Sequence, residues 1–280
     1  MNKNAVKFSF CLLLILLVFS CERKAAVLFY DPYFPQIFPD TENWQKKLEK
    51  AASQCGYNLS FTEIEVSGPV PNIRKNIDEA EISEIIISPV FSPQVETWLN
   101  IFPEQIFFDF LPNAPSLGAN HITDKVNNAN AIKKSIEYMA KSKKISNADI
   151  YAFFLTDSAQ GRTDRDNFLS FSKEYFDPNK ISIIEQKNAG DMPDLPSSIF
   201  DETPSFIFID CFEDSFDLYM KIPENNYCGG FEIIGFRDIK SSILFSIEFS
   251  PADYLIKLLN KTSNGAQKYG NLDPYKLFIF

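Results

Sequence analysis

Residues 84–89 read EIIISP, and the three consecutive isoleucines in this stretch, Ile85 to Ile87, decide the fold class. An uninterrupted apolar run predicts a strand that is buried on both faces. Such strands are typical of parallel sheets that helices cover on either side. Two further runs of the same kind occur at residues 25–30 (AAVLFY) and 150–155 (IYAFFL).

Helical patterns separate these apolar runs. The apolar residues at 44, 48, 51, 52 and 55 recur at the spacing of a single helix face, and Gly56 follows them. The alternation restarts after a loop-rich break near residues 110–127. We therefore expect an α/β fold with two Rossmann-like lobes and mainly parallel sheets. The expected strands cover residues 25–30, 59–66, 84–88, 105–108, 150–155, 181–185, 204–210, 232–236, 243–249 and 277–280.

The charge balance and the scarcity of certain residues exclude several classes of function. The 280 residues include 27 Lys and Arg against 37 Asp and Glu, which gives a net charge of −10. We expect no nucleic-acid partner, because phosphate recognition needs a basic footprint. His121 is the single histidine, which argues against a His-based metal centre, and we expect no metal or other cofactor. We read His121 itself as a loop residue.

The first twenty residues have the pattern of an export signal. Lys3 and Lys7 precede an apolar run over residues 8–19, which has the length of a signal-peptide core. Residues 18–21 (VFSC) resemble a bacterial lipobox, which implies cleavage before Cys21 and lipid modification of that cysteine. A plain signal peptide and an uncleaved anchor are the alternatives. Three cysteines remain, Cys55, Cys211 and Cys228; a Cys211–Cys228 disulfide and buried thiols are both open.

The body of the chain, over roughly residues 25–280, resembles the type I periplasmic-binding-protein superfamily. The resemblance is carried by residues 30–34 (YDPYF), 84–89 (EIIISP), 107–109 (FFD), 162–168 (RTDRDNF), 204–210 (PSFIFID) and 233–238 (IIGFRD). It implies two lobes joined by a hinge of three crossovers, with a ligand cleft between them. The N-terminal lobe is expected over residues 25–110 and 240–270, and the C-terminal lobe over 111–239 and 271–280.

Candidate ligand-binding residues follow the ends of the expected strands, because open α/β sheets bind ligands at the carboxyl ends of their strands. They comprise Asp31, Tyr33, Phe34, Phe91, Asp109, Arg162, Arg165, Asp210, Phe212 and Asp238. Rings stack on sugars or purines, while carboxylates and arginines hydrogen-bond hydroxyls in fixed directions. The alternatives are core packing for the rings, turn or helix caps for Asp31 and Asp210, and surface pairing of the arginines with Asp164 or Asp166.

The resemblance implies a lipid-anchored solute-binding protein, exported to the outer face of a bacterial membrane. It captures a small polar ligand, a sugar in preference to a nucleoside, for an ABC permease. No catalysis is expected, and nothing in the sequence indicates an oligomer. The alternative is a lipoprotein of the same fold that acts as a sensor subunit beside a kinase, or as a protein-interaction module, without a transported ligand.

Overall fold

A computed structural model of the chain divides it into two compact units. It describes residues 23–38, 41–65, 73–75, 77, 82, 84–110, 117–123, 128–145, 147–211, 214–237, 239, 242–261 and 273–280. The first unit consists of Met1–Val126 and Pro251–Leu272, and the second of Asn127–Ser250 and Asp273–Phe280. The chain therefore passes from one unit to the other three times.

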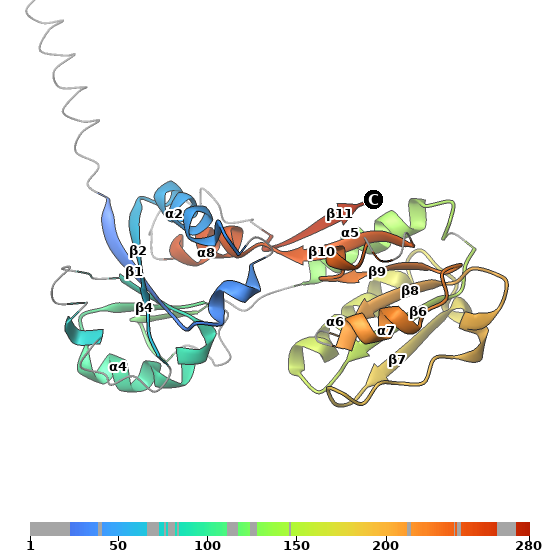
Figure 1. Cartoon of the computed structure of the whole chain (residues 1–280), viewed down its shortest axis with the longest axis horizontal. Coiled ribbons are helices and arrows are strands. Elements are labelled where there is room, and N and C mark those ends of the chain that lie inside the picture. The colour runs from blue at the N-terminus through green and yellow to red at the C-terminus, as the bar shows by residue number, and fades with distance from the viewer. Residues whose placement is uncertain are drawn as a thin grey trace, which may run out of the picture. The chain divides into compact units, whose positions relative to one another are not determined.

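The first unit contains a parallel five-stranded sheet with the order β2-β1-β3-β4-β5 (Figure 1). Its strands are β1 (Lys24–Tyr30), β2 (Tyr57–Glu63), β3 (Glu84–Ile87), β4 (Ile106–Asp109) and β5 (His121–Thr123). Its helices include α2 (Trp44–Gln54), α4 (Val95–Ile101) and α8 (Pro251–Leu259), with 3-10 turns η1 (Phe34–Ile37) and η2 (Pro89–Gln94). Residues 73–75 and 77 are helical as well.

Helices cover both faces of this sheet, as the uninterrupted apolar strands require. Val27 and Phe29 of β1 share a core cluster with Val95 and Trp98 of α4. Helices α2 and α8 pack against one another on the other side of the sheet (Figure 1). The expected face of α2 is confirmed, because Trp44, Leu48, Ala51 and Ala52 are buried.

The second unit contains a six-stranded sheet with the order β11-β10-β9-β8-β6-β7, parallel except for β11. Its strands are β6 (Ile150–Leu155), β7 (Ile181–Gln186), β8 (Phe206–Asp210), β9 (Tyr227–Phe231), β10 (Ile243–Phe249) and β11 (Tyr275–Ile279). Its helices are α5 (Ala129–Lys141), α6 (Ala159–Ser172) and α7 (Ser215–Lys221), with 3-10 turns η3 (Pro178–Lys180), η4 (Ser197–Phe200) and η6 (Ile234–Phe236).

Aromatic packing holds the second sheet to its helices. The ring of Phe168 on α6 lies 4.6 Å from that of Phe208 on β8, centroid to centroid, and 5.6 Å from that of Phe154 on β6. Ring pairs of this geometry add to the stabilisation from burial alone. On the opposite face, Leu218 and Tyr219 of α7 pack in a cluster with Ile207 and Ile209 of β8.

The two sheets share one strand order. The first strand of each unit lies inside the sheet, its second strand lies on one side, and its third to fifth strands follow on the other. This doubly wound order has its topological switch point between β1 and β3 in the first unit and between β6 and β8 in the second. The expectation of two mainly parallel α/β sheets is confirmed.

One expected strand was placed wrongly along the chain. The prediction put it at residues 232–236, whereas the strand is β9, at Tyr227–Phe231, and residues 234–236 form η6. A Cβ atom on Gly229 would lie 2.4 Å from the Phe245 ring, and one on Gly230 would lie 2.0 Å from the Ile209 carbonyl oxygen. Close packing therefore requires both glycines inside the strand. Because glycine usually weakens a strand, the two glycines did not indicate a strand in the sequence.

The boundaries of the units differ from the expected lobes in two segments. Strand β5 pairs with β4 and so belongs to the first unit, although residues 111–126 were expected in the second lobe. Strand β10 pairs with β9 and belongs to the second unit, although residues 240–250 were expected in the first lobe. His121 lies in β5 and is buried, so its interpretation as a loop residue was wrong.

The three cysteines of the described body are free thiols. Cys211 and Cys228 are both buried, and Cys55 is partly buried, so the structure supports the buried-thiol alternative over a disulfide. Burial raises the pKa of Cys55 to about 11 and that of Cys211 to about 12. Within the part of the chain that the structure describes, no helix is long and apolar enough to cross a membrane.

Candidate functional site

Asp31 lies at the switch point of the first sheet. It follows β1, and its Oδ2 atom accepts a hydrogen bond of 2.8 Å from the hydroxyl of Ser88, which follows β3. Its Oδ1 atom accepts a 3.0 Å hydrogen bond from the backbone N–H of Tyr33. The buried carboxylate thus ties the ends of two neighbouring strands together and fixes the turn that carries Tyr33.

Asp109, the last residue of β4, forms a second buried polar group at this edge. Its Oδ1 atom accepts a 2.6 Å hydrogen bond from Ser92, and its Oδ2 atom lies 3.5 Å from Nε2 of His121. The backbone N–H of Leu117 donates to Nδ1 of His121, which places the proton of a neutral imidazole on Nε2, toward Asp109. Burial raises the pKa of Asp109 and lowers that of His121.

The three aromatic candidates of the first unit have different environments. Tyr33 is 72% exposed, and its ring is available to stack on a ligand. Phe34 is 2% exposed and packs against Trp44 and Phe110, while Phe91 is 1% exposed and packs against Trp98. Both phenylalanines are core residues, so the expectation that they line a ligand site is corrected in favour of the packing alternative.

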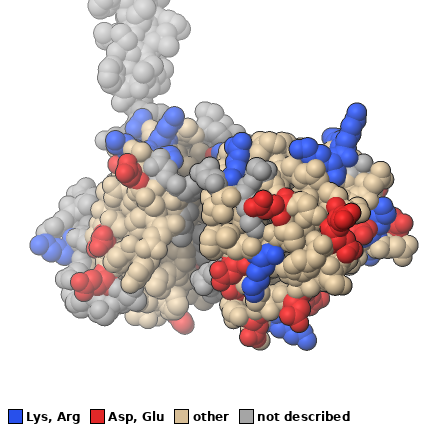
Figure 2. All heavy atoms as spheres, turned by 45° about the vertical axis from the view of Figure 1, so that its right-hand side comes forward, with Lys and Arg blue, Asp and Glu red and all other residues tan. Residues whose placement is uncertain are grey.

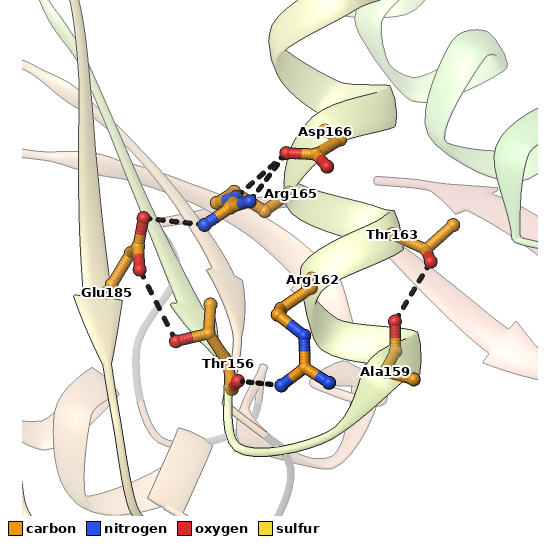
Figure 3. A network of polar contacts seen from close by, with 7 residues as sticks. All are labelled: Thr156, Ala159, Arg162, Thr163, Arg165, Asp166 and Glu185. Carbon is orange, nitrogen blue, oxygen red and sulfur yellow. Dashed lines mark hydrogen bonds and ion pairs between the residues drawn. The ribbon is translucent and has the colours of Figure 1, made fainter.

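The turn from β6 to α6 positions the arginines of the second unit (Figure 3). Ser158 caps α6 by accepting a hydrogen bond from the N–H of Gly161, and Gly161 allows the helix to approach the strand closely. A Cβ atom at that position would lie 1.8 Å from the carbonyl oxygen of Leu155. Arg162 folds back on the turn, where its Nη1 atom donates to the carbonyl oxygen of Thr156 at 2.8 Å.

Arg165 joins α6 to β7 through Glu185 and also pairs with Asp166, its neighbour on the same helix. Its Nη1 atom lies 2.7 Å from Oε1 of Glu185, and its Nε and Nη2 atoms contact Oδ1 of Asp166 at 2.9 and 2.8 Å (Figure 3). The hydroxyl of Thr156 completes the group with a 3.5 Å contact to Glu185. The structure therefore shows the surface pairing of Arg165 with Asp166, and a ligand would have to compete with that pairing.

Two buried carboxyl groups lie at the carboxyl edge of the second sheet. Asp164 on α6 accepts hydrogen bonds from Asn128 (2.7 Å) and Gln160 (2.9 Å), and burial raises its pKa to about 6. Asp210, the last residue of β8, has its pKa raised well above the ordinary value by burial and then by the charges of Asp164 and Glu232. Among the described residues, Oδ2 of Asp210 has no hydrogen-bond partner. The switch point of the second sheet thus carries a buried carboxyl group with one oxygen that lacks a hydrogen-bond partner among the described residues.

The candidates Phe212 and Asp238 lie outside the described residues. Apart from the core residues Phe34 and Phe91, the others form two groups, one at each carboxyl edge. These are Asp31, Tyr33 and Asp109 in the first unit, and Arg162, Arg165 and Asp210 in the second. Within the described part of the chain, no cluster of three or more His, Cys, Asp or Glu side chains is arranged to hold a metal ion.

The structure adds polar residues that the sequence analysis did not select as site residues. Ser88 and Ser92 bind the two carboxylates of the first unit, and His121 contacts Asp109. Asp164 is buried on the stripe of α6 that also contains Gly161 and Phe168. That spacing was a usable signal, because an acid on the apolar stripe of a helix must be buried with partners.

No protein-family model matches the chain, and no curated protein matches it in sequence. Solved structures match its fold. A sugar-binding protein of a sugar ABC transporter from Bacillus halodurans is 12% identical, with a TM-score of 0.56 over 91% of this chain and 97% of that one. A periplasmic ribose ABC transporter protein from Conexibacter woesei is 10% identical, with a TM-score of 0.56 over 93% of each chain.

A LacI-family transcriptional regulator from Brachyspira murdochii gives a similar match, at 15% identity and a TM-score of 0.54 over 92% of this chain and 94% of that one. The chain therefore has the type I periplasmic-binding-protein-like fold, in a divergent form. At these identities the likeness shows the fold alone, and the function has to be argued from the site.

Proposed function

We propose that this chain is an exported solute-binding protein that captures a small polar ligand, a sugar in preference to a nucleoside, and delivers it to an ABC permease. The observation that carries the proposal is the polar edge of each sheet: both switch points of a binding-protein fold carry a buried carboxyl group, Asp31 in one unit and Asp210 in the other. Ligands of doubly wound sheets bind at such edges.

The matching solved structures support a sugar as the ligand. One is a solute-binding protein from Agrobacterium vitis bound with alpha-D-tagatopyranose, at 11% identity and a TM-score of 0.54. Another is a LacI-family regulator from Weissella paramesenteroides with bound glucose. None of these matching proteins is described as an enzyme, which accords with our proposal that the chain binds its ligand without chemical change.

The residues proposed to contact the ligand have distinct roles. Tyr33 offers an exposed ring for stacking on a sugar face. Asp210 offers a carboxyl group whose raised pKa favours the neutral form, which both donates and accepts a hydrogen bond. Arg162 and Arg165 offer guanidinium groups at the start of α6. Asp31 and Asp109 act mainly by holding the strand ends in place. Phe212 and Asp238 stay in the proposed set as predictions.

Export and lipid attachment are part of the proposal. The apolar run at residues 8–19 followed by Cys21 supports an anchor at the membrane surface, through a lipid on Cys21. The proposed location is the outer face of a bacterial membrane, where a permease receives the ligand.

The second candidate function is a lipoprotein of the same fold that serves as a sensor subunit or an interaction module. Specific observations favour it: Phe34 and Phe91 are core residues, and Arg162 and Arg165 both bind groups of their own unit. These features leave fewer side chains for a ligand than the sequence predicted.

Thermal unfolding of the soluble body, residues 22–280, in the presence of sugars, nucleosides and other polar metabolites tests the proposal. A ligand at 100 times its dissociation constant stabilises the native state by about 2.7 kcal/mol, which a screen detects as a shift of several degrees. A shift with sugars that the Tyr33→Ala variant loses supports the transport function. A folded protein that responds to no compound supports the second candidate.

A further inference from the structure

A hollow of about 420 Å³ lies on the first unit between the exposed face of α2 and the beginning of β2. Its lining consists of Arg23, Lys46, Glu49, Lys50, Ser53, Tyr57, Asn58 and Leu59. The four contributions from α2 recur three or four residues apart, which places them on one side of the helix. The buried face of the same helix packs against the core, so the lining residues are held on a rigid element.

The hollow is basic, although the whole chain has a net charge of −10. Arg23, Lys46 and Lys50 contribute three positive charges against the single negative charge of Glu49. Among the described residues, these three cations form no ion pair. Figure 2 shows Lys and Arg side chains gathered at this end of the first unit.

Lys24 extends the positive surface next to the hollow. Its Nζ atom lies 3.0 Å from Oε1 of Glu84 and 5.8 Å from the centre of the Tyr57 ring, which itself lines the hollow. Glu84 is buried and neutralises part of this charge. The cations that remain for an external anion are therefore those of Arg23, Lys46 and Lys50.

The hollow lies at the opposite end of the sheet from the proposed ligand site. Lys24 and Tyr57 pair at the first residues of β1 and β2, so the hollow is at the amino edge of these parallel strands. Asp31 and Ser88 lie at the carboxyl edge. A molecule in the hollow would therefore leave the carboxyl edge accessible.

The sequence places a membrane anchor next to this hollow. Arg23 follows Cys21 by two residues and the apolar run at residues 8–19 by four. A chain spans at most about 3.6 Å per residue, so the Cα atoms of Cys21 and Arg23 are no more than about 7 Å apart. This constraint holds whether Cys21 carries a lipid or the apolar run remains as an uncleaved anchor.

We propose that the basic hollow formed by Arg23, Lys46 and Lys50 is a docking site for the phosphate headgroup of an anionic phospholipid in the anchoring membrane. This inference rests on the membrane anchoring that is part of the proposed function. Lysine and arginine both bind phosphate groups, and basic residues within a Debye length of an anionic surface are attracted to it. Docking there turns the amino edge of the first sheet toward the membrane and its carboxyl edge away from it.

The test uses the full chain with vesicles of phosphatidylcholine alone or phosphatidylcholine mixed with phosphatidylglycerol. Surface lysines are acetylated with an amine-reactive reagent and quantified by mass spectrometry. Each basic residue near an anionic surface is worth roughly a fivefold change in binding, so we expect the labelling of Lys46 and Lys50 to fall about fivefold or more with phosphatidylglycerol. Lys133 and Lys141, exposed on α5, serve as internal references. High salt should restore the labelling.

Two double variants distinguish binding at the hollow from attraction of the whole protein by its net charge. Lys46→Glu/Lys50→Glu should abolish the protection of α2 backbone amides from hydrogen exchange that phosphatidylglycerol confers. Lys133→Glu/Lys141→Glu, which makes the same charge change on another helix, should retain that protection. Flotation with phosphatidylcholine vesicles, which carry no net charge, measures membrane attachment through the anchor independently of the basic hollow. If the chain floats only with phosphatidylglycerol, and only with Lys46 and Lys50 present, the result supports headgroup binding at the hollow. The same result contradicts the proposed membrane anchor.

Equal labelling of Lys46 and Lys50 with both kinds of vesicle would overturn the proposal. Protection by soluble glycerol 3-phosphate with phosphatidylcholine vesicles, and none by phosphatidylglycerol, would also overturn it, because the hollow would then bind a free phosphate compound. Loss of protection in both double variants alike would show that net charge alone attracts the protein, which contradicts a specific site.

Discussion

The hydroxyl of Ser88 donates a 2.8 Å hydrogen bond to Oδ2 of Asp31 and so joins the ends of β3 and β1 across the switch point of the first sheet. Both side chains are buried. Asp31 therefore has a structural role at the position where a ligand-binding role was expected, and it holds the turn on which the exposed Tyr33 lies.

Ser88→Ala should lower the free energy of unfolding by about 1.5–3 kcal/mol, because it leaves a buried carboxylate oxygen without its donor. Urea unfolding of the two proteins measures the difference. Ser182→Ala, at an exposed position of β7, is the control and should stay within about 0.5 kcal/mol of the wild type. Equal effects of the two substitutions would mean that the Asp31–Ser88 bond contributes nothing.

Gly161→Ala should destabilise the second unit by about 2–3 kcal/mol or more, since the new Cβ atom would lie 1.8 Å from the carbonyl oxygen of Leu155. Relief of that clash requires α6 to move away from the end of β6. Thr163→Ala, an exposed site on the same helix, provides the comparison for calorimetry. A Gly161→Ala protein as stable as Thr163→Ala would show that the turn is not closely packed.

Asp164 should make the stability of the second unit decrease as the pH rises. Burial raises its pKa from 3.8 to about 6, so the native state holds a proton that the unfolded state has lost between these values. The contribution of Asp164 to the free energy of unfolding is fully present below about pH 4. It is lost as the pH rises toward and above 6, by up to about 3 kcal/mol.

Asp164→Asn removes that titration. We expect the free energy of unfolding of the variant to rise relative to that of the wild type between about pH 4 and pH 6. Urea titrations across this range measure both. Asp217→Asn, at an exposed position of α7, is the matched control. Parallel pH profiles for wild type and Asp164→Asn would contradict the assignment of a raised pKa to Asp164.

Asp109→Ala should destabilise the folded protein even without ligand, because it removes the partner of both Ser92 and His121 in a fully buried place. The expected cost is about 3 kcal/mol or more. Tyr33→Ala, by contrast, should leave the unfolding free energy within about 0.5 kcal/mol of the wild type, as its ring is exposed. Denaturation of both variants checks the contrast, and equal losses would contradict it.

The fold could be predicted from the sequence because its strands are continuous apolar runs, of which Ile85–Ile87 is the clearest. Two strands, β9 and β5, were not predicted correctly because neither is a continuous apolar run. Strand β9 contains Gly229 and Gly230, at which neighbouring atoms leave no room for a Cβ atom, and β5 has only three residues. The unit boundaries depended on these strands and on the pairing of β10, which no local pattern specifies.

The candidate site was predicted less completely. The strand-end rule found Asp31, Asp109 and Asp210, which do lie at the carboxyl edges. Sequence position cannot tell whether a ring after a strand turns inward, and so it did not separate the exposed Tyr33 from the buried Phe34 next to it. That difference arises from tertiary packing of Phe34 against helix α2 and the residues after β4.

Calorimetric titration of residues 22–280 with a panel of monosaccharides tests the proposal that this chain binds a small sugar. We expect saturable binding of at least one sugar, weakened about tenfold by Tyr33→Ala through the loss of ring stacking worth about 1.4 kcal/mol. No heat of binding with any sugar, from a protein that unfolds cooperatively and is therefore folded, would contradict the claim and favour the sensor or interaction module.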